Sequence, residues 1–190
     1  GAVRGVRFTP RGLRVETVGD RKPRGLCGSG LLSLAARLGE AEALDPFGRL
    51  REPGEVDPSL RDRLVRLPSP VPGGHPLRAF RFCDDPPLHL TQGDLRELRL
   101  ATGALRAALE VTLLRGGVRE EQVEECVLAG AFGAGISRED AVRAGVLPQA
   151  WAGRIRVLGA GALLGLERAL REGDRAWDRV RDLARRAEHI

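Results

Sequence analysis

The sequence lacks methionine and tyrosine entirely and has only two tryptophans among its 190 residues. Its three cysteines, Cys27, Cys83 and Cys126, stand far apart. An odd, scattered set of this kind argues against a disulfide framework and favours a reducing, cytoplasmic setting. Long apolar runs are also missing, so we expect no membrane span and no secretory leader. Because the chain starts at Gly1 without a methionine, we expect it to be part of a longer protein.

Lysine is nearly absent, since Lys22 is the only lysine among 31 Lys and Arg residues. This usage is typical of a GC-rich genome or a thermophile. The basic residues alternate with 26 acidic ones, and few aromatic side chains could stack on bases. We therefore expect a solvated, mixed-charge surface and no nucleic-acid partner. The three histidines lie far apart in the sequence, which predicts no metal site.

The apolar pattern predicts an α/β fold with a mixed sheet and flanking helices. Residues 3–8 and 13–18 alternate apolar and polar side chains around a turn, which predicts a hairpin. Further strands are expected at residues 80–82, 88–90 and 126–132. Residues 155–173 have the pattern of a strand, a glycine turn and a helix. Other helices are expected from residue 28 or 29 to 39 and over residues 91–115, 137–147 and 174–189.

The helix after residue 91 has the strongest signals. Thr91 and Asp94 have the spacing of a capping box, and Gly116 follows the last helical residue. An apolar seam includes Leu105 and Leu109, which we expect to be buried against the sheet.

Proline is concentrated in one segment. Eight of the twelve prolines lie between Pro53 and Pro87, with Gly73 and Gly74 among them. This composition predicts a long irregular excursion over about residues 51–88. Because neither flank alone resembles a complete fold, we interpret it as an elaborated loop within a single domain over residues 1–190.

Two glycine-rich segments open predicted helices, and the second of them also follows a predicted strand. The turn Gly28-Ser29-Gly30 would present backbone N–H groups to an anion, and residues 130–135 would let a ligand approach the backbone. Each segment also has a simpler explanation, as a tight turn for helix packing or as a strand-to-helix connection. Residue types alone favour packing for the first segment and leave the second evenly balanced. No Ser/His/Asp set or paired carboxylates stand out, so no catalytic residue is predicted.

Four segments together resemble one family, in the order GLCGSGLLSLAARL, LDPFGRL, LTQGDLRELRLATGALRAALEVTL and VLAGAFGAGISREDAVRAGVLP. That family is the reductive activators of corrinoid proteins, whose C-terminal part belongs to the ATPase superfamily of actin, sugar kinases and heat-shock chaperones. The resemblance implies a ribonuclease-H-like C-terminal lobe that binds nucleotide. The residues that it points to are Gly28, Ser29, Gly30, Gly130, Ala131, Phe132 and Gly133. It also implies ATP with Mg²⁺ in the full-length protein, and an iron–sulfur cluster in a preceding N-terminal domain.

The resemblance implies one half of an ATP-dependent activator that supports reduction of Co(II) to Co(I) corrinoid in methyltransferase systems. Its partners would be a corrinoid protein or corrinoid methyltransferase and the N-terminal lobe of the same chain, with a homodimer left open. Since the phosphate-holding segments would precede Gly1, we expect the 190 residues alone to be inactive. Ala131, Ala134 and Ala160 stand where the family often has Gly or Asn. These departures leave an alternative, a non-catalytic interaction or dimerisation module of the same fold.

Overall fold

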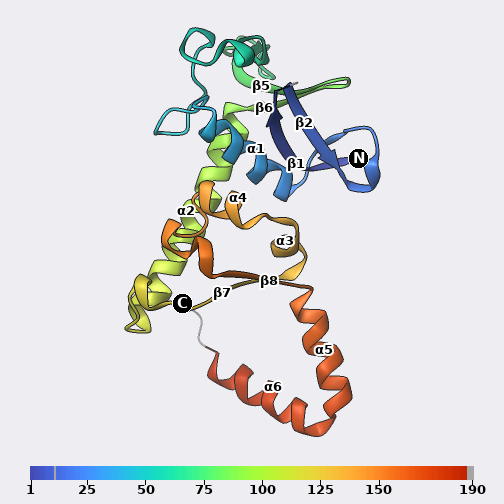
Figure 1. Cartoon of the computed structure of the whole chain (residues 1–190), viewed down its shortest axis with the longest axis vertical. Coiled ribbons are helices and arrows are strands. Elements are labelled where there is room, and N and C mark those ends of the chain that lie inside the picture. Colours follow the sequence, from blue (N-terminus) through green and yellow to red (C-terminus); the bar gives the residue numbers. More distant parts are fainter. Residues whose placement is uncertain (11, 188–190) are drawn as a thin grey trace.

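The structure is a computed structural model that describes residues 1–10 and 12–187, without the side chains of Ala131, Phe132 and Ala134. Its first sheet has the order β2-β1-β3 (Figure 1). Strands β1 (Ala2–Thr9) and β2 (Gly12–Thr17) are antiparallel, which confirms the predicted hairpin, and β3 (Gly25–Leu26) runs parallel to β1. Helix α1 (Gly28–Glu40) follows and packs on β1.

The proline-rich segment is more ordered than its composition predicts. It contains β4 (Leu64–Leu67) and β5 (Leu77–Asp84), and β6 (Pro87–Thr91) completes an antiparallel sheet of order β4-β5-β6. The short strands predicted at residues 80–82 and 88–90 are confirmed within β5 and β6, whereas β4 was not predicted in the irregular excursion expected over residues 51–88. Most of the prolines lie in turns and in the loop between β4 and β5, so they leave the ladder intact.

One hydrophobic cluster joins α1 to both of these sheets. Phe80 on β5 is fully buried, and its ring meets that of Phe8 edge to face, with centroids 6.5 Å apart. Val3 on β1 and Leu34 and Leu38 on α1 are also fully buried in this cluster. The contact between α1 and β1 is therefore a central part of the core.

Helix α2 (Gln92–Arg115) begins with the predicted capping box of Thr91 and Asp94. Leu95 is buried at its start, but the prediction for Leu105 is wrong, because that side chain is 54% exposed. Leu105 lies at the edge of the apolar stripe, and the lower part of α2 extends away from the first cluster. Leu109, nearer the centre of the stripe, packs against a second cluster.

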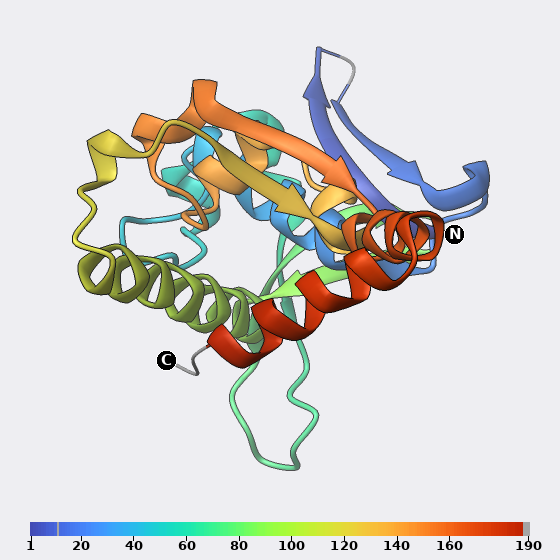
Figure 2. The ribbon, with the colours of Figure 1, turned by 90° about the horizontal axis from the view of Figure 1, so that it is seen from below.

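The second cluster surrounds Trp151 and Ile155 beneath a parallel pair of strands. These strands, β7 (Cys126–Ala129) and β8 (Ile155–Gly159), run side by side in the same direction (Figure 2). Short helices α3 (Gly130–Gly135) and α4 (Arg138–Arg143) connect them, and Ser137 caps α4 as predicted. The strand that the sequence predicted through Phe132 ends at Ala129, because Gly130 already begins α3.

Helices α5 (Gly161–Glu172) and α6 (Asp174–Arg186) form a hairpin that turns at Gly173 and extends from the body (Figure 1). They confirm the predicted C-terminal helices up to Arg186. The α/β class with flanking helices is likewise confirmed, although mixed pairing is confined to the first sheet. Among the helices of residues 1–10 and 12–187, none combines the length and the apolar character that crossing a membrane requires.

Candidate functional site

Three helices begin within two residues of the end of a strand and have no side-chain cap. Helix α1 follows β3, α3 follows β7, and α5 begins two residues after the end of β8. Within the described part of the chain, their N-cap residues Cys27, Ala129 and Ala160 make no side-chain cap hydrogen bond. Helices α2 and α4, by contrast, are capped by Thr91 and Ser137. The first-turn amides of the uncapped helices can therefore bind an anionic ligand.

The three predicted turn residues at the start of α1 differ in their environment. Gly28 is exposed at the first helical position, whereas Ser29 and Gly30 are buried. A Cβ atom at Gly30 would overlap the carbonyl oxygen of Val3 and lie 2.8 Å from its carbonyl carbon. Gly30 therefore allows α1 to pack closely on β1, which is the simpler of the two explanations that the sequence offered.

The pKa of the Cys27 thiol reflects the electrostatics at the start of α1. Its Sγ donates to the carbonyl oxygen of Val3 at 3.2 Å and lies 3.3 Å from Ser29 Oγ. Burial alone would raise its pKa, but the Ser29 hydroxyl and the nearby amides of Gly30 and Ser29 favour the thiolate, outweigh burial and lower the pKa. This end of α1 therefore stabilises negative charge.

The carboxyl ends of β7 and β8 carry two half-buried glycines whose Cβ positions are unoccupied. Ala129 pairs with Gly159 in the ladder, and Gly130 follows directly. Gly130 has φ +94° and Gly159 has φ +72°, and a Cβ at either position would meet none of the described atoms within 4 Å. Glycine is needed here for the backbone conformation, and the space beside it allows a ligand to approach.

Gly133 has a different environment from Gly130. It is buried, and a Cβ atom there would lie 3.3 Å from the carbonyl carbon of Leu128. Gly133 therefore packs α3 against β7, where a Cβ atom would fit tightly. The side chains of Ala131 and Phe132, also predicted for the site, lie outside the described residues.

The fold brings the two glycine segments together although they lie far apart in the sequence. A Cβ atom at Gly135, the last residue of α3, would lie 3.6 Å from the Ser29 side chain. Figure 1 shows α3 between the start of α1 and the end of β8. Gly161, at the start of α5, approaches Ala129 so closely that a Cβ there would lie 3.1 Å from that of Ala129. The starts of α3 and α5 thus lie together, and the start of α1 lies against the end of α3.

A cavity of about 530 Å³ adjoins this region at Gly135, and its walls include Arg4, Arg7 and Arg37. The guanidinium of Arg7 pairs with Glu16 at 2.7 Å, and that of Arg37 pairs with the buried Asp140. Sequence reasoning missed these arginines, because isolated arginines in an arginine-rich chain give no local signal.

The backbone amides and open glycines of this region fit the phosphate or sugar of a nucleotide better than they fit a metal ion. Residues 1–10 and 12–187 contain no group of three or more His, Cys, Asp or Glu side chains that could hold a metal. A magnesium ion at this site would therefore have to be bound by phosphate oxygens and by ligands from elsewhere.

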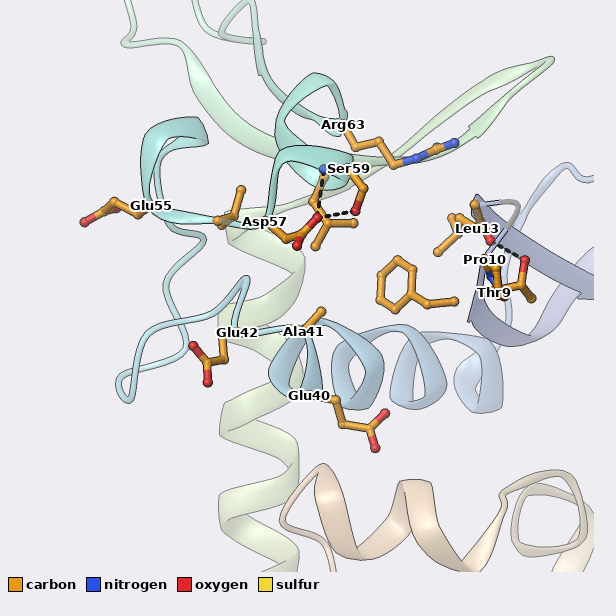
Figure 3. A pocket seen from close by; sticks show the side chains of 14 residues that line it. Thr9, Pro10, Leu13, Glu40, Ala41, Glu42, Glu55, Asp57, Ser59 and Arg63 are labelled. Carbon is orange, nitrogen blue, oxygen red and sulfur yellow. Dashed lines mark hydrogen bonds between the residues drawn. The ribbon is translucent and has the colours of Figure 1, made fainter.

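A second cavity, of about 660 Å³, lies at the opposite end of α1 (Figure 3). Phe8, Leu13 and Leu60 contribute apolar walls. At its edge the Asp57 carboxylate accepts hydrogen bonds from the amide and hydroxyl of Ser59 at 2.9 and 2.6 Å, and these bonds lower its pKa. The residues that line this cavity belong to none of the three uncapped helix starts, so it is separate from the candidate site.

The fold is that of an ASKHA domain, a ribonuclease-H-like class. A solved structure titled "Reductive activator for corrinoid,iron-sulfur protein" matches 97% of the chain with a TM-score of 0.75 and 25% identity. The family model "C-terminal domain of RACo the ASKHA domain" matches residues 1–190. The chain therefore belongs to this family, as its four sequence motifs predicted.

Two curated relatives have names that also refer to corrinoid proteins or corrinoid activation. The chain is 36% identical over 63 residues to "[Co(II) methylated amine-specific corrinoid protein] reductase" of Methanosarcina barkeri. It is 25% identical over 156 residues to "Corrinoid activation enzyme RamQ" of Eubacterium limosum. These matches cover 33% and 82% of the chain but only 12% and 26% of the relatives, and 29% of the solved structure. The chain thus spans less than a third of each protein that it matches.

Proposed function

We propose that this domain is the nucleotide-binding half of an ATP-dependent reductive activator, which supports reduction of Co(II) to Co(I) corrinoid. Membership of the RACo C-terminal family and the titles of its relatives support the corrinoid role. The observation that carries the nucleotide role is Gly130, whose positive φ and open Cβ position lie at the carboxyl end of a parallel strand. Ligands of open α/β sheets collect at such ends.

In this proposal the backbone of the exposed Gly28 and of the half-buried Gly130 contacts the nucleotide, with Ser29, Ala131 and Phe132 completing the wall. Gly30 and Gly133 act indirectly, because they let α1 and α3 pack where their first turns face the ligand. When bound, ATP would supply a phosphoanhydride whose hydrolysis drives a conformational change. The residues of this domain would orient the nucleotide and exclude water from one side of it.

The remaining parts of the proposed machine lie outside residues 1–190. A preceding lobe would hold the phosphates and Mg²⁺, and an iron–sulfur domain would supply the electron that reduces the cobalt of a partner corrinoid protein or methyltransferase. Phosphoryl transfer depends on charge stabilisation around the terminal phosphate. We therefore expect the 190 residues alone to release no phosphate from ATP, which a phosphate-release assay with Mg²⁺ can test.

The decisive variant is Gly130→Val in the full-length protein. A β-branched side chain would resist φ +94° and fill the space beside the strand end, so we expect ATP affinity to fall at least about tenfold, or about 1.4 kcal/mol. The matched control is Gly117→Val, because Gly117 has φ +64° and an open Cβ position at the end of α2. Calorimetric titration that gives equal affinities for the two folded variants would refute the site.

A second candidate function is a non-catalytic interaction module of the same fold. It is favoured by Ala131, Ala134 and Ala160, where the family often has Gly or Asn, because each alanine adds a methyl group or removes an amide donor. Titration of the full-length protein with ATP and ADP separates the two functions. Binding of neither nucleotide would establish the module and exclude the activator role.

A further inference from the structure

The cavity at the far end of α1, which we call the distal cavity, has no role in the proposed function. Its volume is about 660 Å³, and its walls come from the β1–β2 hairpin, the end of α1 and the helical turn Pro58–Arg63. Phe8 and Leu13 on the hairpin are only half-buried, although both pack against the first hydrophobic cluster. The distal cavity therefore presents apolar surface that is continuous with the core, as binding grooves do.

The charges that line the distal cavity are mostly negative. They are the carboxylates of Glu40, Glu42, Glu55 and Asp57 and one guanidinium, that of Arg63. Glu40 pairs with Arg143 at 2.6 Å, and Arg63 pairs with Asp84 outside the cavity at 3.2 Å. In the part of the chain that the structure describes, no cation pairs with the other three carboxylates. On a chain with a net charge of +5, the distal cavity is thus a local concentration of negative charge.

Glu42 is an unfavourable residue for the end of α1. Its amide donates to the carbonyl oxygen of Gly39 at 3.1 Å, and the next amide, of Ala43, donates to that of Leu38 at 2.9 Å. These bonds form a Schellman motif, in which Glu42 has the position that glycine usually takes. Glu42 has φ +52°, which is costly for a residue with a Cβ atom, and its charge lies at the negative end of the helix dipole. Glu42 therefore lowers stability where glycine would raise it, as residues at functional sites often do.

The acidic and apolar walls of the distal cavity lie on different sides. Figure 3 shows Glu42, Glu55 and Asp57 on one side and Pro10 and Leu13 on the other. Successive side chains of an extended peptide point in opposite directions. An extended segment in the distal cavity would therefore direct one side chain to the carboxylates and the next to the apolar wall.

We propose that the distal cavity is the docking site for a segment of a partner protein that carries an arginine or lysine beside an apolar residue. Charge complementarity selects the basic residue, because three carboxylates of the lining have no cation from the described chain. The half-buried Phe8 and Leu13 select the apolar neighbour. The proposal is independent of the nucleotide and corrinoid roles, because the distal cavity shares no residue with the uncapped helix starts.

Selection from a phage library of random short peptides tests the proposal on the full-length protein. Peptides are first enriched on the wild type and then sorted for those that bind it in preference to the double variant Glu42→Gln/Asp57→Asn. The double variant removes two charges but keeps the side-chain shapes and an acceptor for the Ser59 amide. We expect the sorted peptides to contain an arginine or lysine next to an apolar residue.

Fluorescence anisotropy with one sorted peptide gives the magnitude. At low salt we expect its Kd to be at least about fivefold higher for the double variant, and added salt should reduce this difference, because partly exposed charge pairs are screened. The matched control is Glu97→Gln/Glu124→Gln, which removes two exposed carboxylates that do not line the distal cavity and should leave the Kd unchanged. Replacing the basic residue of the peptide by neutral citrulline should weaken binding to the wild type.

Glu42→Gly provides a second test in a variant that should be more stable than the wild type. Because glycine fits φ +52°, we expect its thermal midpoint to rise while its affinity for the peptide falls. Unchanged affinity in Glu42→Gly would overturn the proposal. So would a selection in which no peptide prefers the wild type, or in which the preferred peptides lack a basic residue. A peptide that converts dimers to monomers in sedimentation would also overturn it, because the natural occupant would then be a second copy.

Discussion

Two glycines of helix α1 should respond in opposite directions to the same substitution. Gly30 is buried against β1, where a Cβ atom would overlap the carbonyl oxygen of Val3 and lie 3.3 Å from the amide nitrogen of Arg4. Gly39 lies near the end of the same helix, and a Cβ there would meet none of the described atoms within 4 Å. The variants Gly30→Ala and Gly39→Ala therefore separate the effect of packing from the effect of helix propensity within one helix.

The expected magnitudes follow from these surroundings. Gly39→Ala should stabilise the protein by about 0.5–1 kcal/mol, because it restricts the unfolded chain and favours helix. Gly30→Ala gains the same helix propensity, but its methyl group would overlap the backbone of β1, which cannot rotate away. Helix α1 must then move from β1, and this overpacking should lower the free energy of unfolding by about 1–3 kcal/mol or more. Movement of α1 also loosens Leu34, which is fully buried. The two variants should differ in stability by about 2–4 kcal/mol.

Urea denaturation with tryptophan fluorescence measures this difference, since Trp151 is only 2% exposed and reports on the folded state. In thermal unfolding the same difference corresponds to roughly 4–16 °C for a chain of this length. Equal midpoints for the two variants, or a Gly30→Ala variant as stable as the wild type, would refute the close contact of α1 on β1.

Three further predictions concern other parts of the fold. Asp140→Asn should destabilise the protein by about 3 kcal/mol in urea titration, because its carboxylate is buried beside a guanidinium of α1. Leu95→Ala should lower the free energy of unfolding by about 2–5 kcal/mol, and Leu105→Ala should lower it much less, since Leu95 is 2% exposed and Leu105 is 54% exposed. The reversed order in the same titration would contradict the orientation of α2. Iodoacetamide should modify Cys27 at lower pH than Cys126, because the pKa of Cys27 is lowered and burial raises that of Cys126. Peptide mass spectrometry across a pH series measures the order of modification, and modification of Cys126 at the lower pH would contradict the prediction.

Local signals predicted several elements correctly. The alternation around residues 9–12 gave the hairpin, and the spacing of Thr91 and Asp94 gave the start of α2. Ser137 was likewise recognised as the cap of α4. These features depend on residues within one turn of each other, so a short window of sequence contains the information.

Longer-range features were predicted less well. Leu105 has the right spacing for burial, but whether the edge of an apolar stripe is covered depends on how far the neighbouring elements extend. The strand through Phe132 was predicted too long, since the apolar run continues while Gly130 already turns the chain into α3. Proline content concealed β4 and most of β5, because prolines at strand ends and in loops do not disturb the ladder.

The sequence by itself determined the family, the α/β class and the positions of the two glycine segments at helix starts, because these depend on motifs and on local periodicity. Only the tertiary structure decided what each glycine does. Gly30 and Gly133 are required because backbone and side chains from β1 and β7 lie against them, whereas Gly130 faces open space with a positive φ. Three glycines with similar local sequence thus differ in role, since the atoms that surround each one come from strands and helices that only the folded chain brings together.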